Sequence, residues 1–100
     1  MKLGILVNTN RHLKDVVGLT KAAIAKGHEV MLFNMDDGTK LLGTPEFKEL
    51  CGTKGVIMSF CDHSAKHIGI TTEGLPQEIV CGSQYNNAVM MHDAERVIVL

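Results

Sequence analysis

The sequence places a cysteine at the point where a strand is expected to turn into a helix. Cys61 follows the apolar run Val56–Phe60 and precedes the helical stretch Asp62–His67. A helix N-terminus carries about half a positive charge and several unpaired N–H groups, and both favour a thiolate over a thiol. The pKa of cysteines in such positions falls from about 8.5 into a range of about 3.5–7.5. The position therefore predicts a nucleophilic thiol at Cys61, with an inert, buried side chain as the alternative.

Several histidines could assist this cysteine. His63, Lys66 and His67 add potential positive charge directly after it. His63 is too close along the chain to make a good hydrogen bond to Cys61. His12 could approach Cys61 if the strands that precede these two residues are neighbours in the sheet. A solvated surface position is the alternative for each histidine.

Metal binding is a second chemistry that the spacing allows. His63 and His67 are four residues apart, which puts both on one face of a helix, and Cys61 could be a third ligand. No carboxylate or second cysteine completes a known zinc pattern. We therefore expect neither a metal ion nor an organic cofactor, and a metal-binding module stays an alternative.

An acidic pair, Asp36 and Asp37, precedes Gly38 at the end of another apolar run. No glycine-rich nucleotide motif accompanies the pair, so nucleotide binding is not predicted. The pair is typical of a turn that caps the next segment, and it could instead tune a site or meet a partner. Asp36 and Asp37, together with Asp62, which directly follows Cys61, are therefore candidate residues that support the Cys61 site.

Two further cysteines, Cys51 and Cys81, end apolar stretches, and inert packing is predicted for both. Cys81 could act as a resolving thiol if its loop returns to Cys61. An odd number of cysteines, without C-x-x-C and without an export signal, does not suit a disulfide framework. We therefore expect a reducing, cytoplasmic location.

The composition limits the classes of partner. Ten basic and eleven acidic side chains give a net charge of −1, and no long basic block occurs, which argues against nucleic acid and anionic membrane surfaces. The apolar runs are far shorter than the roughly 20 residues that cross a bilayer. With 100 residues, 45% of them apolar, the chain is expected to form a single domain over residues 1–100 with a modest core.

Four short apolar runs predict the strands that position these residues. They are nearly continuous rather than alternating, which is typical of a parallel sheet covered on both faces. The runs are Leu3–Val7, Val30–Phe33, Val56–Phe60 and Val97–Leu100. Helical patterns lie between them, over Leu13–Ala25, from Pro45 to about Cys51, over Asp62–Ile68 and over Gln84–Asp93. The alternation predicts an α/β fold: a three-layer open sheet, mainly parallel, with helices on both faces, comparable to half of a flavodoxin-like sheet.

In such a sheet, ligands bind outside the carboxyl ends of the strands. Three loops are expected at that edge, over residues 8–12, 34–38 and 61–63, and they hold most of the polar chemistry of the chain. Cys61 is therefore expected where the fold would place a site.

The order of these segments resembles the DsrE/DsrF/TusD-like sulfur-relay family over nearly the whole chain. The similar segments are Gly18–Val30, the stretch from Phe33 through Asp36-Asp37-Gly38 to Leu42, Gly55–Cys61 with Ala65 and Gly69 downstream, and Ala94–Leu100. The resemblance implies a compact α/β fold, oligomers of three or six subunits, and relay of sulfur between proteins as a persulfide. It aligns Cys61 with the cysteine that carries sulfur in the family.

These points lead to a hypothesis of a small cytoplasmic sulfur carrier, of sulfurtransferase type, with protein donors and acceptors of sulfur as partners. A homo-oligomer, trimeric or hexameric, would also cover apolar side chains. The residues expected to be covered in this way are Ile68, Ile70, Leu75, Ile79, Val89, Met90 and Met91. The alternative hypothesis is a non-enzymatic subunit of the same fold that binds an anion or a small molecule, or serves assembly, with an inert Cys61.

Overall fold

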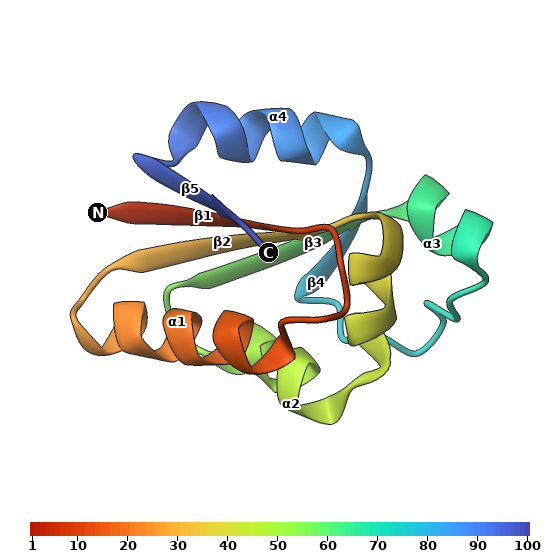
Figure 1. Ribbon diagram of the computed structural model, residues 1–100, viewed down its shortest axis with the longest axis horizontal. Coiled ribbons are helices and arrows are strands. Elements are labelled where there is room, and N and C mark those ends of the chain that lie inside the picture. Colours follow the sequence, from red (N-terminus) through yellow and green to blue (C-terminus); the bar gives the residue numbers. More distant parts are fainter.

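Five parallel strands form a single sheet in the computed structural model, which describes all residues from 1 to 100 (Figure 1). The strands lie in the order β4-β3-β2-β1-β5, and every neighbouring pair is parallel. Their bounds are Lys2–Val7 (β1), Glu29–Asn34 (β2), Val56–Cys61 (β3), Ile79–Gly82 (β4) and Arg96–Val99 (β5). The predicted α/β class with a parallel sheet is confirmed.

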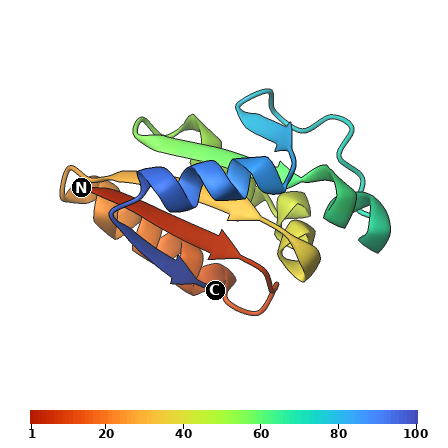
Figure 2. The ribbon, with the colours of Figure 1, turned by 90° about the horizontal axis from the view of Figure 1, so that it is seen from above.

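The helices cover the two faces of the sheet unequally. Their bounds are Leu13–Ala25 (α1), Asp36–Gly43 (η1, a 3-10 helix), Pro45–Lys48 (α2), Glu49–Gly52 (η2, also 3-10), Asp62–Ile68 (α3) and Gln84–Asp93 (α4). α1 and α2 lie on one face, α4 crosses the other face alone, and α3 projects beyond the carboxyl ends of the strands (Figures 1 and 2). No helix has the length and apolar character needed to cross a membrane.

Two elements differ from the prediction. The fifth strand, β4, was not expected, because its apolar run is only three residues long and stops at Gly82. As an edge strand it buries a single residue, Ile79, so its sequence carries little of the signal of a central strand. The acidic pair does not form a simple turn: Asp36 and Asp37 open the 3-10 helix η1.

The hydrophobic core lies almost entirely on the α1 side of the sheet. Fifteen buried residues form the core there, with large side chains from β1, β2, β3 and α2. On the α4 side only three buried residues form a cluster: Phe33, Cys61 and Met90. Few side chains are therefore buried between α4 and the sheet, and one of them is Cys61, the cysteine that the sequence analysis identified.

The loop after β2 is held tightly against the carboxyl end of β1. A Cβ at Gly38 would overlap the backbone carbonyl of Val7, so only glycine fits this approach. The fully buried Asn34 donates a hydrogen bond from Nδ2 to the Gly38 carbonyl oxygen at 2.8 Å. Asp36 adopts a positive φ of 48°, which aspartate tolerates better than most residues. These contacts fix η1 at the edge where the site was expected.

Replacing Gly38 with alanine should destabilise the fold, because the added methyl group meets backbone atoms that cannot move aside. We expect the free energy of unfolding to fall by about 1–3 kcal/mol. Gly18→Ala is the matched control, since nothing lies within 4 Å of a Cβ at this exposed helical position. That control should gain about 0.5–1 kcal/mol. Urea denaturation measures both, and a Gly38→Ala protein as stable as the parent would contradict the close approach.

Candidate functional site

Cys61 ends β3 and stands directly before α3, at the carboxyl edge of the sheet as expected. It is the N-cap residue of α3, with extended backbone angles of φ −83° and ψ 110°. Gly69 ends the same helix in the left-handed conformation that glycine favours. The Cys61 side chain packs with Phe33 and Met90, and only 4% of the residue is exposed. The thiol therefore lies on the α4 side of the sheet, close to the surface but covered.

Two opposing effects act on the acidity of Cys61. Burial is the largest single effect, and it raises the pKa of the thiol. The nearby hydrogen-bond donors together lower the pKa by a larger amount, so that the net pKa lies below the usual cysteine value. The donors are the hydroxyl and backbone N–H of Ser64, the side chain of Gln84 and the backbone N–H of His63. No side-chain hydrogen bond of capping geometry joins Cys61 to α3, so these donors act as an electrostatic environment for a thiolate.

The other two cysteines have the opposite environment. Burial and the negative charge of Glu78 raise the pKa of Cys51. Burial and the Asp62 carboxylate raise the pKa of Cys81, although Cys81 is an exposed residue. Cys61 is thus the only one of the three thiols whose surroundings favour the anion.

Cys81 and Cys61 lie on neighbouring strands but face opposite sides of the sheet. In the β3–β4 pairing, Cys81 is opposite Phe60 and Cys61 is opposite Gly82. Because successive side chains of a strand alternate between faces, Cys81 shares the face of Phe60, whereas Cys61 points toward α4. Two cysteines whose Cβ vectors point apart cannot form a disulfide without backbone movement. The geometry that a resolving thiol at Cys81 would need is therefore absent.

The charged residues of α3 pair with one another. Lys66 Nζ lies 2.9 Å from Asp62 Oδ2, and this ion pair holds the pKa of the Asp62 carboxyl below its usual value. The exposed rings of His63 and His67 stack, with their centroids 6.4 Å apart. No third side chain joins them, because no group of three or more His, Cys, Asp or Glu residues converges anywhere in the structure. The histidine pair alone does not form a metal centre.

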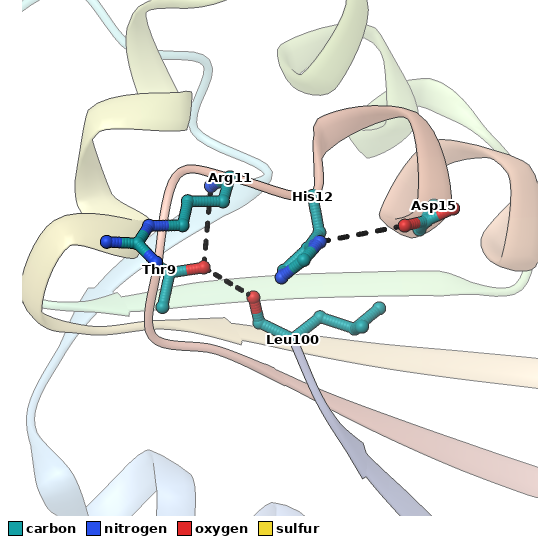
Figure 3. Close-up of polar contacts among 5 residues, drawn as sticks. All are labelled: Thr9, Arg11, His12, Asp15 and Leu100. Atoms are coloured by element: carbon teal, nitrogen blue, oxygen red, sulfur yellow. Dashed lines mark hydrogen bonds and ion pairs between the residues drawn. The ribbon is translucent and has the colours of Figure 1, made fainter.

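His12 is not brought to Cys61. The approach required β1 and β3 to be neighbours, but β2 lies between them. His12 instead precedes α1, where its Nδ1 is 3.7 Å from Asp15 Oδ2 (Figure 3). In the same loop, Thr9 Oγ1 donates a hydrogen bond of 2.8 Å to the carbonyl oxygen of Leu100 (Figure 3). This cluster joins the end of β1 to the end of the chain.

Asp36 and Asp37 lie at the same edge as Cys61, because η1 packs against α3. Asp37 Oδ1 is 3.4 Å from Lys40 Nζ in an exposed pair, which contributes at most about 1 kcal/mol. Neither carboxylate is among the groups that shift the pKa of Cys61. The acidic pair therefore belongs to the surroundings of the site and does not act on the thiol.

The sequence prediction missed Gln84, which opens α4 next to Cys61. The start of α4 is fixed by a capping box at Ser83. Ser83 Oγ accepts a hydrogen bond from the N–H of Tyr85 at 3.2 Å, and the N–H of Ser83 donates one to Asn86 Oδ1 at 3.0 Å. From there the Gln84 Nε2 reaches Met35 Sδ at 3.7 Å. A serine followed three residues later by a side-chain acceptor is a readable signal of this helix start, but the contact to Met35 depends on the strand order.

An apolar groove of about 340 Å³ runs beside α4 on the same face as Cys61. The sheet contributes Ile57, Ser59 and Val80 to its lining, and α4 contributes Tyr85 and Val89. Ser59 is two residues before Cys61 on β3, so both face α4. The groove and the cysteine therefore lie on the same face of β3, two residues apart at their nearest strand positions.

No protein-family model and no curated protein matches this chain. Among solved structures, the fold is similar to the crystal structure of the YchN protein from E. coli, with a TM-score of 0.72. The similarity covers 99% of this chain and 97% of YchN, at 15% sequence identity. The chain thus shares the α/β fold of YchN over nearly its whole length.

Proposed function

We propose that this chain is a cytoplasmic sulfur carrier that holds sulfane sulfur as a persulfide on Cys61. The observation that carries the proposal is the contrast between the three thiols. Only Cys61 stands at a helix start among donors that lower its pKa, while the pKa values of Cys51 and Cys81 are raised. The resemblance to the DsrE/DsrF/TusD-like family, which aligns Cys61 with a sulfur-carrying cysteine, supports the same function.

The transfer needs two thiol exchanges and no cofactor. The Cys61 thiolate attacks the outer sulfur of a donor persulfide, forms Cys61–S–SH, and releases the donor as a thiolate. The thiolate of an acceptor protein then attacks the outer sulfur of Cys61–S–SH, and Cys61 leaves as a thiolate again. The low pKa helps both steps, since it increases the thiolate fraction and makes Cys61 a better leaving group.

One observation favours a second function. Cys61 is 4% exposed and packs against Phe33 and Met90, as a structural cysteine does. In this second function the chain is a non-enzymatic subunit, its thiol is inert, and the apolar groove beside α4 binds a small molecule. The two functions differ in whether Cys61 can exchange sulfur.

We also propose that the chain assembles with copies of itself into a trimer or hexamer. Large apolar side chains are exposed on the α4 face and on β5. They include Ile57 at 60%, Val80 at 46%, Met91 at 42% and Val99 at 55% exposure. Ile57 and Val80, on the neighbouring strands β3 and β4, form the part of this surface that another copy would cover.

The apolar residues available for this subunit interface differ from those that the sequence predicted it would cover. Ile79 and Met90 are buried within the chain itself, and Ile70 and Leu75 pack against its core. Of the expected set, only Met91 is a largely exposed apolar side chain. The proposed interface therefore uses exposed side chains of the neighbouring strands β3 and β4 instead.

Cys61 should lose its proton at a lower pH than the other two cysteines. Three double variants each keep one thiol, and the rate of alkylation by iodoacetamide is followed against pH. Because alkylation consumes the thiolate, the rate rises with pH through the pKa. The midpoint for Cys61 is expected below the ordinary cysteine value, and those for Cys51 and Cys81 above it. A Cys61 midpoint at or above that of Cys81 would contradict the proposed site.

Sulfur loading should be specific to Cys61. After incubation with a small-molecule persulfide, mass spectrometry is expected to find one added sulfur atom on Cys61. The addition should be lost in Cys61→Ser and retained in Cys51→Ser and Cys81→Ser. If the Cys61 thiol loses its proton below the ordinary cysteine value but never accepts sulfur, the ligand-binding subunit becomes the better account.

Assembly should depend on the α4 face. Sedimentation at micromolar concentration is expected to give a trimer or hexamer, and Ile57→Asp should shift it toward monomer by placing a charge in the interface. Leu19→Asp is the matched control, because Leu19 is 39% exposed on α1, at the opposite face of the sheet. A monomeric parent protein would refute the assembly proposal.

A further inference from the structure

A contact between Gln84 and Met35 passes over the end of β3. Gln84 follows β4 and Met35 follows β2, and β3 lies between these two strands. Their side chains meet at 3.7 Å, from Gln84 Nε2 to Met35 Sδ. The last residue of β3 is Cys61, so the bridge crosses the position of the thiol. Met35 also packs against the buried cluster of Phe33, Cys61 and Met90, in which Cys61 is 4% exposed.

The orientation of the Gln84 carboxamide is set by Asn87. Asn87 Nδ2 donates to Gln84 Oε1 at 3.2 Å, one turn further along α4. With the carbonyl oxygen held in this way, the amino end of the carboxamide faces the sulfurs. A carboxamide has two N–H donors, and one of them is directed to Met35 Sδ. The second N–H is free for a negatively charged sulfur at Cys61.

We propose that Gln84 controls Cys61, covering the thiol together with Met35 and donating an N–H to its anionic form. Asn87 is the positioning residue that orients Gln84. This inference rests on the proposed sulfur-carrier function, and it names how that site is regulated. Exchange with a partner requires the Gln84 side chain to swing away from Met35.

The bridge is suited to opening. Gln84 is an exposed residue, and a thioether is a weak acceptor, so little is lost when the side chain turns into solvent. No acidic residue lies in the first turn of α4. Of the neighbouring elements, α3 carries Asp62, His63, Lys66 and His67, η1 carries Asp36, Asp37 and Lys40, and β4 carries Cys81 on the opposite face of the sheet. The Gln84 carboxamide is uncharged, so in this proposal it acts on Cys61 by hydrogen bonding and by steric cover.

The test uses Cys51→Ser/Cys81→Ser as the parent, so that Cys61 is the sole thiol. Alkylation by iodoacetamide against pH gives two readouts: the midpoint, which reports acidity, and the plateau rate at high pH, which reports access. Gln84→Ala should raise the midpoint by about one pH unit, the effect of one hydrogen bond to a charged group. It should also raise the plateau rate several-fold, because the cover is gone.

Two further variants separate the two roles. Gln84→Glu keeps a side chain of the same size over the thiol but replaces its N–H donors with a negative charge. The midpoint should therefore rise at least as far as in Gln84→Ala, while the plateau rate should stay as low as in the parent. Asn87→Leu should raise the midpoint by a smaller amount. Asn87 Oδ1 is buried without a partner, so this change removes an unsatisfied group and should leave the urea midpoint of unfolding unchanged. Gln77→Ala, at an exposed glutamine in the loop before β4, should move neither readout.

Failure of this inference is distinguishable from failure of the carrier function. If the parent accepts sulfur on Cys61 but Gln84→Ala changes neither midpoint nor plateau rate, the role of Gln84 is refuted and the carrier function stands. If both readouts shift as expected but no persulfide forms in any variant, Gln84 controls a thiol that does not carry sulfur. An Asn87→Leu midpoint equal to that of the parent would refute the positioning role.

Discussion

The site depends on the alternation of side chains along β3. Phe60 points into the large core under α1, and the next residue, Cys61, must therefore point to the opposite face. That face is covered by α4 alone, and only Phe33 and Met90 are buried beside the cysteine. A shift of the β3 register by one residue would place the thiol in the main core. The packing of Phe60 thus determines that Cys61 lies near the surface.

The differences between the three cysteines follow from the place of each one in the fold. Cys81 sits on an edge strand next to the Asp62 carboxylate, which disfavours its thiolate. Cys51 lies in η2, near the charge of Glu78, with the same result. Cys61 alone combines a helix start with neutral donors from two elements, Ser64 of α3 and Gln84 of α4. The direction in which the pKa of each thiol is shifted therefore follows from the neighbours that the fold gives it.

Much of the fold could be predicted, because the central strands are continuous apolar runs and the helices have clear ends. The bounds of α3 and α4 agree with the prediction to the residue, since Gly69 and Ser83 mark a helix end and a helix start. The edge strand β4 could not be predicted, because it buries only Ile79. For the site, Cys61 could be located from its place between strand and helix. The separation of Cys61 from His12 and the contact between Gln84 and Met35 could not be predicted, because both follow from the strand order β4-β3-β2-β1-β5.

The pairing of β1 with β5 has a consequence for how the chain folds. It joins Leu3 to Arg96, almost the two ends of the chain, whereas β1–β2 and β2–β3 pair segments that are close in sequence. Closing so large a loop carries the greatest entropic penalty, so this pairing is expected late in folding. α4 is the connection that leads into β5, and it packs on the face of the sheet to which Cys61 points. α4 is therefore expected to settle over Cys61 late in folding, and until then the thiol of a newly made chain is expected to be open to oxidation.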